Sequence, residues 1–222
     1  MDQRPWYVDF FDGDYLRIFT PVLPEERTAA EVNAVVERLG LAPGARLLDL
    51  CCGQGQRVGL VQADMRRLPF AAASFDAVLN LFNAFGYLED EAQDELVLHE
   101  VARVLRPGGL FLQELANREA VVRGWHDSDV VRHDDGLIVL QERSLDLRTS
   151  RDLVGYTLLH PDGRRSTGGH AIRLYTLTEL EAMLCRAGLE LQEVSGDLDG
   201  GPLELDSAFV VTLSARAGKG IS

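Results

Sequence analysis

The first half of the chain alternates short, mainly apolar runs with an amphipathic stretch. The runs stop at glycine, proline or polar residues, which is typical of buried strands. They cover residues 47–50, 58–63, 75–82 and 110–115. Residues 91–105 predict a helix, and the glycine turn of residues 106–109 ends it. Its inward positions are Leu96, Val97, Val101 and Val104. Strand, helix, turn and strand in this order predict a βαβ unit of a parallel sheet.

Upstream of these strands, another helix is predicted to begin at a capping box formed by Thr28 and Glu31. Four apolar residues then follow at the spacing of one helix face. They are Val32, Val35, Val36 and Leu39. Gly40 and the Pro43-Gly44 pair end this helix.

The second half of the chain has an antiparallel pattern. Three strands are predicted over residues 137–147, 153–160 and 170–175. The turn Pro161-Asp-Gly163 joins the last two and favours antiparallel pairing.

A second capping box, Thr178 with Glu181, predicts a final helix that ends at Gly188. Its apolar positions are Leu180, Met183 and Leu184. The closing strands cover residues 189–194 and 208–213.

Aromatic residues are concentrated near the N-terminus, from Trp6 to Phe19. Two interpretations remain open. The segment is either a helix or loop that packs its rings onto the domain, or a lid over a ligand. Its position before the first helix permits the second interpretation.

The first strand runs into a glycine turn, Gly53-Gln-Gly55. Glycines here let the backbone turn sharply and let a ligand approach without meeting a Cβ. The dinucleotide fingerprint needs a third glycine, but Val58 occupies that position and Gly59 comes one residue late. Asp49 places a carboxylate at the same rim.

Four stretches resemble, in order, the motifs of class I S-adenosylmethionine (SAM)-dependent methyltransferases, of the small-molecule, type 11/25-like branch. They are LDLCCGQG (48–55), ADMRRLPF (63–70), FDAVLNLFNAFGYL (75–88) and LRPGGLFLQEL (105–115). The tail over residues 173–194 resembles the last helix and strand of that family. The resemblance implies a Rossmann-like α/β sheet, mostly parallel with an antiparallel last strand, and a small antiparallel β insert that caps the pocket or contacts a second subunit.

The resemblance also implies a SAM site. Asp49 and the amides of the glycine loop would hold the methionyl end, and Asp64 would accept from the adenine amino group. Met65 would offer an apolar face to the adenine ring, and the backbone around Leu81 and Phe82 would approach the methionine portion. The cofactor-binding residues predicted in this way are Asp49, Cys51, Gly53, Gly55, Asp64, Met65, Leu81 and Phe82. A purely structural role stays open for Asp64, which can cap the turn that follows it.

No general base is assigned from the sequence. Histidine is the usual base near neutral pH, and His170 and Tyr175 in the last strand of the insert are weak candidates. Many reactions of this class need only a deprotonated acceptor.

The chain departs from the family between the first two motifs. The family places a helix, a strand and another helix there, and that strand ends in the acid that holds the ribose. Here Gln56 and Arg57 alone separate Gly55 from Val58, whereas a parallel crossover needs about a dozen residues. Three explanations remain: a segment omitted from this sequence, a natural or engineered deletion, or a strand pairing that the family does not show. We favour an omitted segment because every other element is kept.

Composition narrows the class of protein. The chain has 222 residues and a formal net charge of −13, which disfavours partners bound mainly through phosphates. Its three cysteines form neither a disulfide framework nor a metal-binding spacing, so no metal site is predicted. There is no signal-like N-terminus and no apolar run near the roughly 20 residues of a membrane span, so we expect a cytoplasmic protein.

These observations predict one methyltransferase domain over residues 1–222 that transfers a methyl group from SAM to a small molecule. Its parts are an N-terminal segment and helix (1–45), a SAM-binding core (46–116), a β insert (about 137–175) and a final helix with strands (176–216). A homodimer through the insert is possible. The alternatives are an RNA or protein methyltransferase, or a non-catalytic binding domain if the segment after Gly55 is truly absent. The acceptor, including whether it is nitrogen, oxygen or carbon, is not identified.

Overall fold

The computed structural model of this chain describes residues 18, 25–52 and 59–218, with only the backbone for residues 25–28. The predicted aromatic segment from Trp6 and the predicted glycine contacts of Gly53 and Gly55 lie outside the described residues. So does the predicted join at Gln56 and Arg57. The chain divides into two compact units, of which one contains residues 124–174 and the other residues 31–123 and 175–222.

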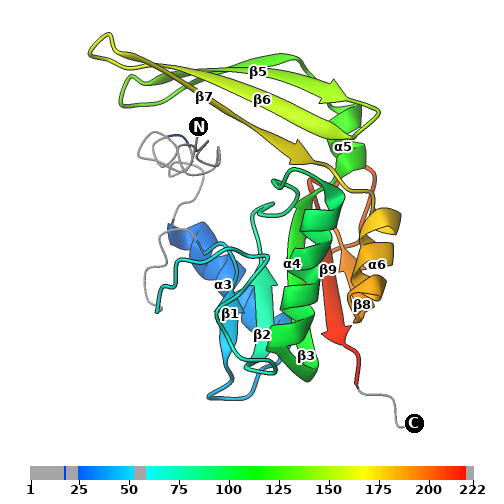
Figure 1. The fold of residues 1–222 in the computed structure, drawn as a ribbon. Coiled ribbons are helices and arrows are strands. Elements are labelled where there is room, and N and C mark those ends of the chain that lie inside the picture. The colour runs from blue at the N-terminus through cyan, green and yellow to red at the C-terminus, as the bar shows by residue number, and fades with distance from the viewer. Residues whose placement is uncertain (1–17, 19–24, 53–58, 219–222) are drawn as a thin grey trace, which may run out of the picture. The chain divides into compact units, whose positions relative to one another are not determined.

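The larger unit is built on a five-stranded sheet in the order β1-β2-β3-β9-β8 (Figure 1). Its strands are β1 Leu47–Asp49, β2 Phe75–Asn80, β3 Leu105–Ala116, β8 Leu189–Ser195 and β9 Phe209–Arg216. The strands β1, β2 and β3 are parallel, and β9 is antiparallel to both β3 and β8. The predicted fold class, a mostly parallel sheet with an antiparallel last strand, is therefore confirmed.

Helices cover both faces of this sheet (Figure 1). The helices α4 (Glu91–Val104) and α6 (Leu177–Arg186) pack on a core that includes Val78, Phe111 and Leu115. On the opposite face, Val35 and Leu39 of α3 (Glu25–Leu39) pack on Leu79 and Leu112. Because successive strand residues point to opposite faces, residues 78 and 79 contribute to different cores.

The helix α4 begins at Asp90, whose side chain accepts a hydrogen bond from the Gln93 amide at 2.9 Å. Such an N-cap satisfies one of the free amides at the helix start. Three of the four predicted inward residues, Val97, Val101 and Val104, are fully buried, but Leu96 is 50% exposed. Leu98 is buried instead, so the buried face of the helix is rotated from the predicted one toward Leu98.

The capping predictions for the other two helices were wrong. The N-cap of α6 is two residues earlier than expected, and its capping box joins Thr176 and Glu179. Two Thr-x-x-Glu patterns overlap here, and the pattern at Thr178 lies inside the helix. α3 begins at Glu25, so Thr28 does not start it.

The apolar face predicted for α3 is only half buried. Val35 and Leu39 are buried, whereas Val32 and Val36 are 54% and 62% exposed. Arg38 donates to Asp197 and Glu193 on the side of β8. The helical spacing therefore turns Val32 and Val36 toward the other side, where β1 forms the edge of the sheet.

Residues 59–63 form no strand, which corrects the prediction for residues 58–63. Leu60 and Val61 are 57% and 58% exposed. A buried strand needs a neighbour to pair with and a layer to pack against. In the described sheet β1 is an edge strand, and two residues cannot supply the crossover that would place residues 59–63 in parallel beside it.

The smaller unit is a four-stranded antiparallel sheet in the order β4-β5-β6-β7. Its strands are β4 Ser128–Arg132, β5 Ile138–Asp146, β6 Arg151–Leu159 and β7 Arg165–Arg173. Burial alternates along β6, and Val139, Val154, Tyr156 and Leu158 form the core. The predicted antiparallel insert is confirmed, although β7 begins five residues before the predicted start. The strand β4 and the short helix α5 (Arg118–Arg123) were not predicted.

Candidate functional site

Of the site residues predicted from the motifs, Asp49 ends β1, and Leu81 and Phe82 directly follow β2, its parallel neighbour. Asp64 and Met65 lie in the segment before β2. Asp49 of β1 is paired with Leu79 of β2, and the Leu50 amide donates to the Leu79 carbonyl at 2.9 Å. The loops that follow both strands therefore begin at one edge of the sheet. In open α/β sheets this edge is where ligands bind.

Asp49 is the last residue of β1, and Cys51 lies in the turn that follows it. Cys51 has a φ of 67°, in the left-handed region that side chains disfavour. Its Sγ lies 3.1 Å from Sδ of Met65, so the turn after β1 contacts the ADM stretch. Two predicted cofactor contacts are thus brought together.

The carboxyl group of Asp49 is electrostatically unusual. The residue is exposed as a whole, yet protein atoms around the carboxyl desolvate it and raise its pKa to about 6. Desolvation, followed by the charge of Asp49 and the neighbouring thiol of Cys52, also raises the pKa of the Cys51 thiol to about 12. The thiol is therefore a neutral side chain at physiological pH, and Asp49 is the ionisable group of this turn.

The ADM stretch is held by ion pairs and helix α4. Arg66 Nε and NH2 lie 3.0 Å and 2.6 Å from Oδ1 and Oδ2 of Asp64, and this hydrogen bonding lowers the pKa of that carboxyl. Glu100 accepts from the Leu68 amide at 2.7 Å. The loop is therefore tethered to α4, although the described residues directly before it, 59–63, form no strand.

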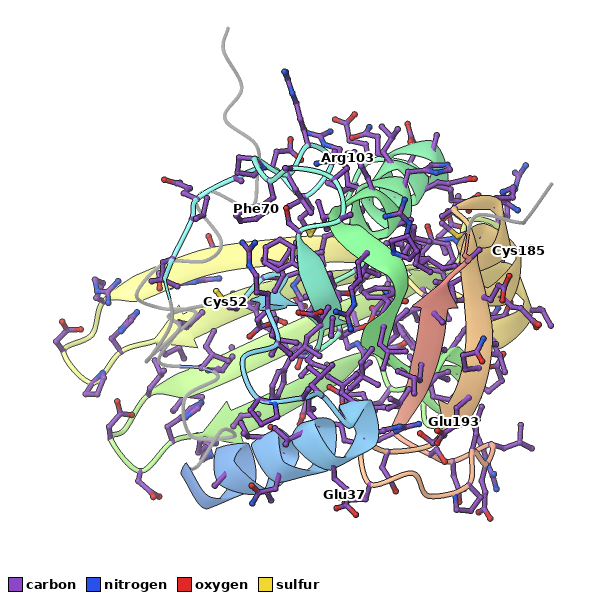
Figure 2. All side chains as sticks on the ribbon, turned by 90° about the horizontal axis from the view of Figure 1, so that it is seen from below. Glu37, Cys52, Phe70, Arg103, Cys185 and Glu193 are labelled. Atoms are coloured by element: carbon purple, nitrogen blue, oxygen red, sulfur yellow. The ribbon has the colours of Figure 1, made fainter. Side chains whose placement is uncertain are left out.

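Arg103 of α4 adds a second tether. It donates to the Phe70 carbonyl at 2.8 Å and to the Leu68 carbonyl at 2.9 Å, and Figure 2 shows Arg103 beside Phe70. Glu100 forms an ion pair with the same guanidinium at 2.6 Å. Asp64 and Met65 therefore belong to a loop whose later residues, Leu68 and Phe70, are held by α4.

The turn after β2 contains two consecutive left-handed residues, Phe82 (φ 56°) and Asn83 (φ 55°). The Phe82 amide donates to Oε2 of Glu114 at 3.0 Å. Phe82 itself is 45% exposed, and Leu81 is half-buried against the α3 core. Sequence reasoning found Leu81 and Phe82 but not Glu114. The only available signal was a glutamate within the apolar strand pattern of residues 110–115.

The two weak base candidates lie in different units. Tyr175 is buried in the larger unit and donates its hydroxyl to Oδ2 of Asp94 at 2.7 Å. His170 belongs to the smaller unit, where it lines an open cavity of about 350 Å³ with Arg143 and Val154. Burial, only partly offset by Asp152, lowers the pKa of His170 to about 4. An imidazole with that pKa is a poor base near neutral pH.

The described groups fit part of SAM. Asp49 offers an acceptor for an ammonium, the turn after β2 offers backbone groups, and Asp64 and Met65 offer a carboxylate and an apolar surface. The acid that holds the ribose in the family has no counterpart in the sequence, because only Gln56 and Arg57 stand where its strand would be.

The described part of the chain contains no group of three or more His, Cys, Asp or Glu residues that could hold a metal ion. None of its helices is long and apolar enough to cross a membrane.

The chain is similar to known methyltransferases in sequence. Residues 28–113 match a family described as a methyltransferase domain. The chain is 31% identical over 147 residues to a dTDP-3-amino-3,4,6-trideoxy-alpha-D-glucopyranose N,N-dimethyltransferase of Streptomyces venezuelae. This match covers 64% of the chain and spans 60% of the relative's length.

Solved structures share the fold. A SAM-dependent methyltransferase of Clostridium acetobutylicum matches with a TM-score of 0.76 at 14% identity, over 96% of this chain and 100% of that one. SAM-bound CalS10 of Micromonospora echinaspora, an amino pentose methyltransferase, matches with a TM-score of 0.69 at 22% identity, over 93% and 98% of the two chains. At these identities the likeness concerns the fold.

Proposed function

We propose that this chain, whose sequence and fold are those of a class I SAM-dependent methyltransferase, transfers a methyl group from SAM to a small-molecule acceptor. One observation carries the proposal: β1 and β2 are paired in parallel and bring Asp49 and the turn at Phe82 to one sheet edge. Those are the positions at which the motifs resemble the family. The relatives support a small-molecule acceptor, and the net charge of −13 opposes a nucleic acid.

The role of this chain's residues is to bind and orient. SAM supplies the activated methyl group, and an in-line displacement requires mainly that donor and acceptor be held in contact. The ionised Asp49 would accept from the ammonium of the methionyl end. Asp64 would accept from the adenine amino group while Arg66 holds its carboxylate in place, and Met65 would lie against the ring. No base is assigned, because the acceptor can lose its proton to water.

An amine on a small sugar is the first acceptor class to test, because the Streptomyces venezuelae relative is named as an amino-sugar N,N-dimethyltransferase. The protein is incubated with SAM carrying a labelled methyl group and a panel of amino sugars, hydroxylated sugars, fatty acids and quinones. Transfer of label to one class, lost in Asp49→Ala, supports the proposal. Label transfer that is equal in both proteins would contradict the role of Asp49.

A second candidate is a domain that binds SAM without catalysis. The specific observation behind it is the two-residue join between Gly55 and Val58, where the family has its ribose contact. Saturable SAM binding with no label transferred to any acceptor class would favour this candidate over the enzyme. Label transfer would exclude it.

A homodimer through the smaller unit is also proposed. β4 is an edge strand whose five residues are all exposed, and Val130 and Val131 are 51% and 42% exposed. Edge strands of this kind pair readily with another chain. Light scattering should give twice the chain mass of 24.5 kDa, and Val131→Lys should give the monomer mass. A wild-type monomer would refute the dimer.

A further inference from the structure

We infer that Glu114 is a positioning residue that fixes the turn after β2, and with it the methionyl side of the proposed SAM site. The inference rests on the proposed function. Glu114 lies in β3, one strand away from the turn, and none of the four sequence motifs marks it as a contact. Its effect on a ligand would therefore pass through Phe82 and Asn83.

Glu114 holds both residues of the turn. Its carboxylate Oε2 accepts from the Phe82 amide at 3.0 Å, and its backbone carbonyl accepts from the Asn83 amide at 3.1 Å. The side chain is nearly buried, with the residue 4% exposed. A hydrogen bond from an amide to a carboxylate is stronger than one between neutral groups, and burial shields it from water.

The turn is tied to β3 on both sides of this contact. Oδ1 of Asn83 accepts from the Ala116 amide at 3.0 Å. Just before the turn, Nε2 of Gln113 donates to Oδ1 of Asn80 at 3.2 Å, and both residues are buried. Asn80, Phe82 and Asn83 are thus each bonded to a residue near the end of β3.

These contacts explain how an unfavourable backbone conformation persists. Phe82 and Asn83 both have a Cβ, and both adopt a positive φ near 55°. Left-handed backbone is unfavourable for residues other than glycine, so it persists where surrounding contacts over-determine it. Glu114 supplies two of those contacts, and Asn83 supplies a third with its own side chain.

Packing alone does not require a glutamate at this position. Leu112, two residues earlier on the same face of β3, and Val211, opposite Glu114 on β9, both belong to the apolar core under α3. An aliphatic residue would extend that core, whereas a buried carboxylate loses hydration. The bond to the Phe82 amide compensates for that loss. The glutamate is therefore best explained by the turn that it holds.

The test compares Glu114→Ala and Glu114→Gln with a matched control, Glu179→Ala. Glu179 also accepts from a backbone amide, that of Thr176 at 2.8 Å, but in the capping box of α6. SAM affinity is measured by calorimetry and folding by thermal melting. Glu114→Ala should weaken SAM binding by about tenfold, the loss expected for one charged hydrogen bond. Glu114→Gln keeps an acceptor oxygen and should stay within about threefold of wild type. Glu179→Ala should melt earlier without losing affinity.

Amide hydrogen exchange gives a readout that does not depend on SAM. Phe82 and Asn83 should exchange faster in Glu114→Ala than in wild type, and at wild-type rates in Glu179→Ala. If Glu114→Ala does not fold, Asn83→Ala is used instead of it in both measurements, because this variant loses the bond to the Ala116 amide.

The outcomes separate the two claims. No SAM binding by the wild type refutes the proposed function. Equal SAM affinity in folded Glu114→Ala and wild type refutes only the positioning role. Equal loss of affinity in Glu114→Ala and Glu179→Ala would also refute it, since a general loss of stability would then explain the effect.

Discussion

The two strands that lead to the candidate site end in very different surroundings. β2 has Ala77 and Val78 fully buried, and Glu114 of β3 holds the turn that follows it. β1 has only three residues, lies at the edge of the described sheet and leaves Leu47 45% exposed. Each strand is followed by a residue with a left-handed backbone conformation, Cys51 after β1 and Phe82 after β2. The turn after β2 is bonded to the next strand, whereas the described contact of Cys51 is to the sulfur of Met65.

This difference separates two parts of the described sheet. The strands β2, β3 and β9 each have a hydrogen-bonded neighbour on both sides, whereas β1 has one. Large apolar side chains are exposed in β1 (Leu47), in α3 (Val32 and Val36) and in the segment before β2 (Leu60 and Val61). Of the two groups proposed to hold the methionyl end, the turn at Phe82 is therefore fixed by a buried strand, whereas Asp49 ends the exposed strand β1.

The largest expected effect comes from removing a buried side chain of β3, compared with removing an exposed apolar side chain of β1. Phe111→Ala, which empties a site that is 1% exposed, should lower the free energy of unfolding by about 3–5 kcal/mol. Leu47→Ala should lower it by less than about 1 kcal/mol, because Leu47 is already solvated. Urea unfolding of the two variants measures both values. Similar losses would show that β1 is buried in solution.

Asp49→Asn should weaken SAM binding between about tenfold and a hundredfold, because the amide cannot neutralise the ammonium of the methionyl end. Calorimetry measures the change. Asp76→Asn is the matched control: Asp76 accepts from the Arg46 amide at 2.6 Å, near the amino end of β2, and should not affect affinity. A loss in both variants would indicate a change of fold rather than of charge.

The pH dependence of binding should follow Asp49. Its pKa is raised to about 6, and only the ionised form attracts an ammonium. SAM affinity should be constant above pH 7 and fall as the pH is lowered through 6, reaching about a tenth of its plateau value near pH 5. In Asp49→Asn this fall should disappear. A fall that persists in the variant would belong to another group.

The smallest effect is expected from the exposed pair between Arg66 and Asp64. Arg66→Ala should change the free energy of unfolding by less than about 1 kcal/mol, because water screens this pair. Chemical denaturation measures it. Arg103→Ala, which removes the tethers to Phe70 and Leu68, should cost more and serves as the comparison. A larger loss of stability in Arg66→Ala than in Arg103→Ala would contradict the view that Arg103 is the main tether of the loop.

Much of the fold followed from the sequence because its signals are local. The mainly apolar run of residues 75–82 and the Pro-Gly-Gly stretch of residues 107–109 predicted a parallel unit without any tertiary information. The same reasoning failed at residues 59–63, where an apolar run has no strand to pair with. β4 was missed because its five residues are all exposed and carry no buried pattern.

The sequence predicted the candidate-site residues that lie in a motif, but not the residue that contacts the site from a distant part of the chain. Asp49, Cys51 and Met65 were predicted, and the structure brings them together at one edge. Glu114 was not, because a glutamate in a strand looks like any other outward position until its bond to the Phe82 amide is known. The start of α6 at Thr176 was missed because overlapping Thr-x-x-Glu patterns are equivalent in sequence.

We propose that Asp49 and the turn at Phe82 contribute much of the affinity for SAM by holding its methionyl end. Calorimetric titration of the wild-type protein with SAM, and separately with methylthioadenosine, which lacks the amino acid portion, tests this proposal directly. We expect saturable binding of SAM and much weaker binding of methylthioadenosine. No heat and no thermal shift with SAM, or equal affinity for the two compounds, would contradict the proposal.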